Sequence, residues 1–188
     1  MCEDLKKQNV SRLMEQVNKI EQKRYWYALY TRPRFEKKVD LQLKELDIQT
    51  FLPIRTVTKY WSDRKKKIDE PLFPSYLFVY ANSKEQYLTF QTYGAVRLVS
   101  FNGTPTRIPD EQIHAVRRVL ESGYTPIVNH YFVKGDEVEI VSGPLVGIKG
   151  FVIEHRGSNH FSVFISGIRQ AVAVNIEAHN IKLIARKN

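Results

Sequence analysis

The chain has 188 residues, 43% of them hydrophobic, and a formal net charge of +9 from 29 Lys+Arg against 20 Asp+Glu. It has no run of about 18 apolar residues and no signal-peptide centre, so we expect a folded cytoplasmic protein without a membrane partner. The single cysteine, Cys2, excludes an internal disulfide. The basic balance favours a polyanion or an acidic protein surface as partner.

Residues 1–24 form an extension that precedes the first clear strand. Apolar residues recur in it at spacings of three and four, at Val10, Leu13, Val17 and Ile20. This spacing predicts a short amphipathic helix. Two interpretations stay open, a frayed extension or a docking helix.

Residues 25–121 read as an α+β domain. The segment YWYALY predicts a buried strand that ends at a turn through Pro33. A helix follows, whose apolar face carries Phe35, Val39, Leu43 and Leu46 and whose solvent face carries Glu36, Lys37, Lys38, Asp40 and Lys44.

Residues 48–80 predict a long β-hairpin. Its two strands, IQTFLPIRTVTKYW and PLFPSYLFVY, enclose the polar segment SDRKKKIDE, which we expect to be a loop. The basic tip, Arg64 to Lys67, either approaches DNA or keeps an exposed hairpin soluble.

The remainder of this domain completes a β-α-β-β-α-β order. A helix is expected with Ser83 as its N-cap, then the strand AVRLVSF, a turn at Asn102-Gly103, and a helix that starts at Pro109. This order predicts a ferredoxin-like antiparallel sheet with helices packed on one face.

The last third of the chain has a different sequence pattern. Residues 122–133 read as a linker, and residues 134–188 contain five short strands separated by Gly- and Ser-rich turns. This pattern predicts a small five-stranded all-β barrel of the SH3-like kind.

The segment EPLFPSYLFV, residues 70–79, is apolar on both faces. In a strand, Tyr76 and Phe78 point to one side while Leu77 and Val79 point to the other. If helices cover one side of the sheet only, the second side is either a contact surface or covered by another domain.

The segment GDEVEIVSGPLVGIKGFVIE, residues 135–154, has the pattern of a KOW motif. Val138 and Ile140 are expected to point inward. Its turn and glycine positions are Gly135, Asp136, Gly143, Pro144, Gly147 and Gly150. The same glycines serve to build a small barrel whatever the function.

Together these segments resemble NusG-like transcription factors over residues 24–186. The resemblance rests on Trp26-Tyr27, FPSYLFV, Gly94, Ile108-Pro109 and the KOW segment, which occur in the family's order. It implies an NGN domain followed by a KOW domain. EPLFPSYLFV is closer to the specialised RfaH-type antiterminators than to general NusG, which has glycine where this chain has Ser75. The resemblance therefore implies an elongation and antitermination factor serving selected operons, for example surface-polysaccharide clusters.

The resemblance also implies contact residues. Contacts with the β′ clamp helices of RNA polymerase fall to Tyr76, Phe78, Phe101 and Ile113, and contacts with the non-template DNA strand to Tyr30, Arg32, Arg34 and Lys38. Two departures matter. The RfaH-type contact with the polymerase β gate loop uses His-Thr-Thr, whereas this chain has Tyr87-Leu88-Thr89, so that contact stays open. Ser166 replaces the aromatic with which general NusG meets Rho and a small-subunit ribosomal protein.

Three alternatives to a dedicated antiterminator were weighed. A general NusG-type factor would couple to Rho or the ribosome, and a ribosomal or RNA-binding protein would concentrate its basic charge in the C-terminal domain. An enzyme is not expected, because the five histidines (His114, His130, His155, His160 and His179) lack metal-ligand spacing and no nucleophile lies beside a base. We expect no cofactor and no metal.

Overall fold

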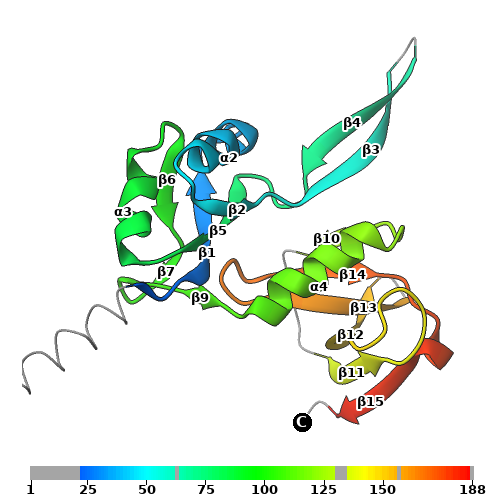
Figure 1. Ribbon diagram of the computed structural model, residues 1–188. Helices are drawn as coiled ribbons and strands as arrows, with labels where there is room; N and C mark the ends of the chain where they lie inside the picture. The colour runs from blue at the N-terminus through cyan, green and yellow to red at the C-terminus, as the bar shows by residue number, and fades with distance from the viewer. Residues whose placement is uncertain (1–21, 62–63, 130–134, 156–157, 187–188) are drawn as a thin grey trace, which may run out of the picture.

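The computed structural model describes residues 22–61, 64–129, 135–155 and 158–186. The helix predicted around Val10 to Ile20 falls outside these residues. An N-terminal α/β domain lies beside a C-terminal β-domain, and a thin two-stranded ribbon projects from the first (Figure 1). Within the described part of the chain, no helix has the length and apolarity needed to cross a bilayer.

The N-terminal domain is built on an antiparallel sheet with strand order β2-β5-β1-β6, to which β9 adds by pairing with β1. Its strands are β1 (Tyr25–Thr31), β2 (Gln49–Phe51), β5 (Tyr76–Ala81), β6 (Ala95–Leu98) and β9 (Arg107–Ile108). The mixed α/β architecture expected from the sequence is confirmed.

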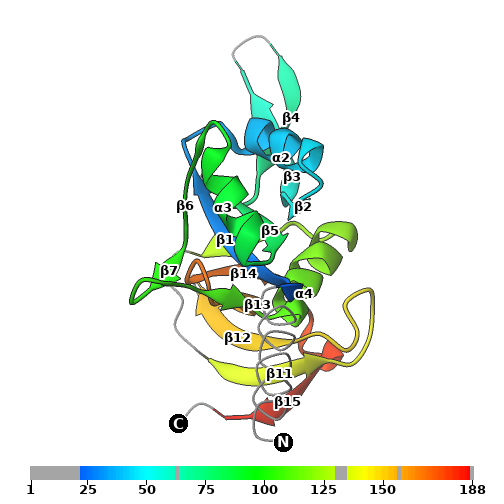
Figure 2. The same ribbon diagram turned by 60° about the vertical axis from the view of Figure 1, so that its left-hand side comes forward.

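Two helices, α2 (Glu36–Glu45) and α3 (Ser83–Gln91), cover one face of this sheet (Figure 2). Val39 and Leu43 of α2 are fully buried there, as their spacing predicts. Two acidic residues that were expected on the solvent face are buried instead. Glu36 accepts a hydrogen bond from the backbone N–H of Ser75, and Asp40 accepts from Thr50 Oγ1 and Lys44 Nζ.

The N-cap of α3 is Asn82, one residue earlier than predicted. Its side chain accepts hydrogen bonds from the backbone N–H groups of Lys84 and Glu85, and the Glu85 side chain accepts from the N–H of Asn82. This reciprocal capping box satisfies donors that a helix start leaves unpaired, so Asn82 is the better cap here.

The expected single hairpin over residues 48–80 is divided in two. β2 and β5 pair within the sheet, whereas β3 (Ile54–Tyr60) and β4 (Lys65–Pro71) form a separate two-stranded ribbon. The predicted polar loop is therefore wrong, because most of SDRKKKIDE is strand β4. A ribbon with solvent on both sides needs no apolar alternation, so charged residues do not prevent strand pairing.

After α3 the prediction is only partly right, because the expected strand AVRLVSF ends at Leu98 as β6 and its last two residues form a separate strand, β7. β7 (Ser100–Phe101) and β8 (Thr104–Pro105) form a hairpin in which Asn102 and Gly103 both have positive φ, as a tight Asn-Gly turn requires. Helix α4 (Asp110–Glu121) begins directly after Pro109.

The C-terminal β-domain is an antiparallel sheet with strand order β10-β14-β13-β12-β11-β15. Its strands are β10 (Ile127–Asn129), β11 (Asp136–Ile140), β12 (Lys149–His155), β13 (Ser158–Ile165), β14 (Gln170–Val174) and β15 (Ile181–Ala185), with a 3₁₀ turn at Ala178–Asn180. The described sheet thus has six strands rather than five. β10 lies within the predicted linker of residues 122–133, because its short Ile-Val pair joins β14.

Two hydrophobic cores result. One lies between the N-terminal sheet and helices α2 and α3 and includes Leu43, Leu77 and Val79. The other is larger and continuous across both domains, joining Phe78 of the sheet and Val116 of α4 to Val163 of the C-terminal β-domain. The second core therefore holds the two domains together.

Candidate functional site

Strand β5 carries apolar side chains on both faces of the N-terminal sheet, as the sequence predicts. Leu77 and Val79 face the helices, whereas Tyr76 and Phe78 face the opposite way. The strand does not extend back to Phe73, because Ser75 has a φ of 65° and turns the chain there. We call the side of the sheet that bears Tyr76 and Phe78 the apolar face.

The apolar face is rich in aromatic contacts. Phe78 stacks on Phe51 with ring centroids 6.1 Å apart, and it meets Phe73 edge-on at 5.8 Å. Tyr76 packs against the same core, to which Ile113 of α4 also belongs. Three of the four residues expected to bind polymerase therefore come together.

The fourth predicted contact, Phe101, lies apart from this core. It sits on the β7–β8 hairpin with 74% of its surface exposed. Phe78 and Ile113, by contrast, are 0% and 2% exposed. The predicted contact set thus divides into one accessible residue and a buried group.

Helix α4 and the C-terminal β-domain together cover the apolar face. A Cβ atom on Gly167 would lie 2.8 Å from Ile108 side-chain atoms, which shows how closely the turn after β13 approaches β9. Gln112 Oε1 accepts hydrogen bonds from the backbone N–H of Ser166, at 2.9 Å, and from its hydroxyl. Arg118 of α4 donates to the carbonyls of Pro144 and Val146. These contacts define a closed arrangement of the two domains.

A cluster of cations and aromatic rings lies where β1 runs into α2. The ring of Tyr93 has Lys38 Nζ 4.9 Å and the Arg32 guanidinium 5.5 Å from its centroid. Phe35 meets Tyr93 edge-on at 5.5 Å. An exposed ring flanked by two cations suits both a base, which stacks, and a phosphate, which pairs with charge.

The other two residues expected to bind DNA lie outside this cluster. Tyr30 contacts Tyr76 at 5.3 Å, on the apolar face, with the Arg97 guanidinium 6.0 Å from its ring centroid. Arg34 lines a different cleft of about 500 Å³, together with residues of the ribbon such as Lys59. The structure therefore unites Arg32 with Lys38, places Tyr30 next to Tyr76, and separates Arg34.

A comparison with known protein families identifies the family to which this chain belongs. Residues 24–117, half of the chain, match the family described as NusG, transcription termination factor nusG. The chain belongs to the NusG family. The matched segment contains the apolar face, the cluster around Tyr93 and most of α4.

Relatives extend this similarity beyond the matched segment. The transcription termination/antitermination protein NusG of Streptococcus pyogenes serotype M3 is 27% identical, covering 83% of this chain and 94% of its own length. The NusG of Thermus thermophilus is 28% identical over 76% of this chain and 90% of its own. A solved structure titled "Domain interaction in Thermotoga maritima NusG" is 25% identical, with a TM-score of 0.51, and covers 86% of this chain and 98% of that one. This chain is thus a NusG-type termination/antitermination factor.

The glycine-rich segment of the C-terminal β-domain has the geometry its sequence predicts. Val138 and Ile140 point inward and are buried. Gly147 has a φ of 81°, and a Cβ on Gly150 would lie 2.5 Å from the carbonyl oxygen of Ser162. Gly135 and Asp136 lead into β11, while Gly143 and Pro144 lie in the following turn. These residues shape the sheet, and Pro144 also accepts the hydrogen bond from Arg118.

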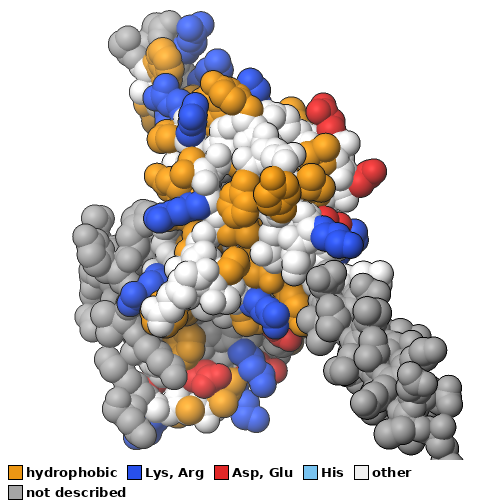
Figure 3. All heavy atoms as spheres, turned by 90° about the vertical axis from the view of Figure 1, so that its left-hand side faces the viewer, with side chains coloured by type: hydrophobic (Ala, Val, Ile, Leu, Met, Phe, Trp, Pro, Cys, Tyr) orange, Lys and Arg blue, Asp and Glu red, His pale blue; other side chains and the backbone are white. Residues whose placement is uncertain are grey.

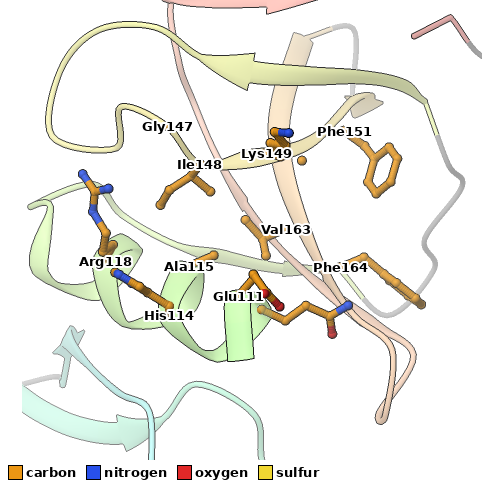
Figure 4. A pocket seen from close by; sticks show the side chains of 12 residues that line it. Glu111, His114, Ala115, Arg118, Gly147, Ile148, Lys149, Phe151, Val163 and Phe164 are labelled. Carbon is orange, nitrogen blue, oxygen red and sulfur yellow. The ribbon is translucent and has the colours of Figure 1, made fainter. Parts of the chain in front are cut away.

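A cavity of about 560 Å³ lies between α4 and the C-terminal β-domain. Ala115, Ile148 and Val163 point toward one another in it, and Arg118 lies beside them (Figure 4). This cavity opens to solvent and lies at the edge of the contact between α4 and the C-terminal β-domain.

Sequence reasoning missed the exposed aromatic surface of this NusG-family chain. Hydrophobic side chains gather over the α3 side of the molecule (Figure 3). Those more than a third exposed there are Tyr87, Leu88, Phe90, Tyr93 and Val96. The sequence did contain a signal for this surface. The apolar residues of α3 do not recur at a helical spacing, so they do not form one buried face. Among the described residues, no cluster of three or more His, Cys, Asp or Glu is placed to hold a metal.

Proposed function

We propose that this NusG-family chain binds RNA polymerase through the apolar face of its N-terminal sheet, at the β′ clamp helices. One observation carries the proposal. Strand β5 is apolar on both sides. Helices α2 and α3 cover the side of Leu77 and Val79, whereas the side of Phe78 packs with α4 and the C-terminal β-domain. Part of the cover on this side is therefore a separate domain, whose place a partner can take.

The chemistry of the apolar face suits a helical partner. Tyr76, Phe78 and Phe51 offer large rings that bury much area with little loss of side-chain freedom. Ile113 adds an aliphatic edge from α4. Phe101, already exposed, is a first point of contact that needs no rearrangement.

Binding in this way requires the closed arrangement to open. Phe78 and Ile113 cannot touch a partner while the C-terminal β-domain covers them. Residues 122–126 connect α4 to β10 and are the only described connection between the two domains along the chain. The proposed factor thus exists as a closed form and an open, polymerase-binding form.

We assign the neighbouring cationic surface to the non-template DNA strand. Arg32 and Lys38 with the ring of Tyr93 supply charge and a stacking surface, and Tyr30 with Arg97 continues it toward the apolar face. Arg34 lies across Pro33 in the separate cleft, so the assignment rests mainly on Arg32, Lys38 and Tyr30.

The finer role we propose is that of an RfaH-type antiterminator, which suppresses pausing or termination at selected operons. FPSYLFV and Ser75 support this specialisation over a general NusG factor. The N-terminal domain, residues 25–121, corresponds in this proposal to a ferredoxin-like NGN domain and residues 134–188 to a KOW domain that recruits a partner such as a small-subunit ribosomal protein. Ser166, which binds Gln112 here, takes the position through which general NusG meets Rho.

Capture of core RNA polymerase tests the proposal. Gly167→Asp places a carboxylate against Ile108 and Ala28 and opens the domains, so it should capture more polymerase than the unchanged chain. Adding Tyr76→Ala and Phe78→Ala to the open variant should abolish most of that capture, because these rings supply the contact area.

Two matched variants control for charge and folding. Asn175→Asp adds the same charge at an exposed site of the C-terminal β-domain and should leave capture unchanged. Leu41→Ala removes an exposed apolar side chain of α2, on the opposite side of the sheet, and should retain capture in the open variant. Equal capture by the open chain with and without Tyr76 and Phe78, both variants being folded by circular dichroism, would refute the assigned face.

A further inference from the structure

The β3–β4 ribbon is a projecting arm that the proposed polymerase contact leaves unused. Each strand has seven residues, so the ribbon is about 23 Å long at roughly 3.3 Å per residue. It stands away from both domains (Figure 1), and its side chains are largely exposed. No core therefore dictates the residue types in its outer half.

Charge divides the ribbon into two halves. Near the sheet, Glu70 pairs with Arg55 at 2.9 Å and with Lys59 at 3.3 Å, and Asp69 accepts a hydrogen bond from Thr56. Burial alone would raise the pKa of Glu70, but the hydrogen bonds and charges of Arg55 and Lys59 hold it below its ordinary value. The inner half is thus electrically balanced.

The outer half is strongly basic. Its described residues carry four cations and no acid, namely Arg64, Lys65, Lys66 and Lys67. Ser62 and Asp63, which follow β3 in the sequence and lie outside the described residues, add a single acid. A net charge of about +3 therefore belongs to the outer part of the arm.

The cross-strand register places Lys66 opposite a second lysine, Lys59, whose ion pair with Glu70 offsets part of the repulsion. Like charges directly opposite each other destabilise a strand pair. Neither lysine is buried, so packing does not require them. Binding of an anionic partner would relieve the remaining repulsion between Lys59 and Lys66.

Cations occupy both faces of the ribbon. Directly opposed residues share a face, so Lys65 and Lys67 lie on one side with Tyr60, while Lys59 and Lys66 lie on the other. Tyr60 is 74% exposed and has Lys65 Nζ 5.0 Å from its ring centroid, and Trp61 is 58% exposed. The arm therefore presents charge in two opposite directions and aromatic rings at its end.

We propose that the β3–β4 ribbon binds double-stranded DNA by entering a groove. The major groove of B-form DNA admits a two-stranded β-ribbon and is flanked by two rows of phosphates, which match lysines on two faces. The deep, narrow major groove of duplex RNA does not admit such an arm. A single DNA strand would contact only one face of the ribbon. The inference goes beyond the proposed function and does not depend on it.

Fluorescence anisotropy with the full-length chain tests this inference. The probes are a labelled 24-base-pair DNA duplex, one of its strands, and the RNA duplex of the same sequence. Lys65→Gln, Lys66→Gln and Lys67→Gln together should weaken duplex DNA binding at least about tenfold near 0.1 M salt. The slope of log K against log salt should become shallower by about 2 to 3, since each lost phosphate contact removes about 0.9.

A charge-matched control removes three exposed cations elsewhere, through Lys84→Gln, Lys182→Gln and Arg186→Gln. It should keep both the affinity and the salt slope near those of the unchanged chain. Equal loss in the two triple variants would reduce the effect to net charge and overturn the inference. So would a ribbon variant whose binding to the single strand or the RNA duplex falls as much as its binding to duplex DNA.

A direct readout comes from the tip itself. The chain has two tryptophans, Trp26 and Trp61, so Trp26→Phe leaves Trp61 as the reporter. Duplex DNA should change the Trp61 emission of this variant at the same concentrations that change the anisotropy. Unchanged emission while the duplex binds would place the binding elsewhere and overturn the inference.

Discussion

The two sides of the N-terminal sheet are equally buried but differently covered. Leu77 on one side and Phe78 on the other are both 0% exposed. Leu77 lies under helices that belong to the same βαβ sequence, whereas Phe78 belongs to a core that α4 shares with a domain joined by a short connection. Burial alone therefore does not distinguish a permanent core from an exchangeable contact. The connectivity of the covering element does.

The largest difference between the two sides should appear at Phe78. In the closed chain, Phe78→Ala should lower the free energy of unfolding of the N-terminal domain by about 4 kcal/mol. In the Gly167→Asp background the cost should fall by at least about 1 kcal/mol, because contacts with the C-terminal β-domain are already lost. Urea unfolding followed by tryptophan fluorescence in a Trp61→Phe background, which leaves Trp26 as the reporter, measures both values. Identical costs would mean that Phe78 belongs to a permanent core.

Leu43→Ala tests the side of the N-terminal sheet that α2 and α3 cover. Its core contains no residue of the C-terminal β-domain, so we expect a loss of about 3 kcal/mol that is the same in closed and open chains. The same unfolding measurement applies. A cost that depends on Gly167→Asp would show that the two sides are coupled.

Gly167→Asp alone should weaken domain closure by at least about 2 kcal/mol, since an ionised carboxylate would meet Ile108 and Ala28. Small-angle X-ray scattering should report a larger radius of gyration. Asn175→Asp should leave it unchanged. A compact Gly167→Asp chain would mean that the turn after β13 does not control closure.

Ser75→Gly addresses the turn that feeds β5 without altering either covering layer. Ser75 has a φ of 65°, which a residue with a Cβ adopts at a cost of about 1 kcal/mol, so glycine should stabilise the domain by about that amount. Ser100→Gly, in strand β7, should give no gain. The midpoint of thermal unfolding compares them, and a destabilised Ser75→Gly would point to a role of the serine side chain.

The smallest effect should come from the β3–β4 ribbon, which lies outside both cores of the N-terminal sheet. The pKa of Glu70 is lowered, so its ion pairs contribute fully above the ordinary carboxyl pKa and are lost as the pH falls through the lowered value. Because the group is partly exposed, we expect only a few tenths of a kcal/mol. Trp61 emission in the Trp26→Phe chain between pH 7 and 3 should show the change, and Glu70→Gln should remove it.

Much of the N-terminal sheet was predictable because its strands bury apolar side chains, and burial leaves a regular pattern in the sequence. The alternation of Leu77 and Phe78, the Asn102-Gly103 turn and the start of α4 at Pro109 all follow from local chemistry. The ribbon was mispredicted since paired strands with solvent on both sides need no apolar rhythm. β10 was missed because three residues are too few to establish a period.

The candidate site was predictable only in part. Tyr76 and Phe78 share a strand, so their common face follows from the sequence. That the C-terminal β-domain covers them depends on a contact between Gly167 and Ile108, 59 positions apart in the chain. The ring of Tyr93 between Arg32 and Lys38 likewise depends on the tertiary fold, and no spacing rule joins these three residues.

The pairing of β10 with β14 limits how far the domains can separate. Only residues 122–126 are free of paired strands between α4 and the C-terminal β-domain, and five residues span at most about 18 Å. An undocked C-terminal β-domain therefore remains tethered at an effective local concentration on the order of millimolar. Any ligand for the apolar face has to outcompete that tethered neighbour, so the tether itself sets a threshold that weak, accidental binders do not pass.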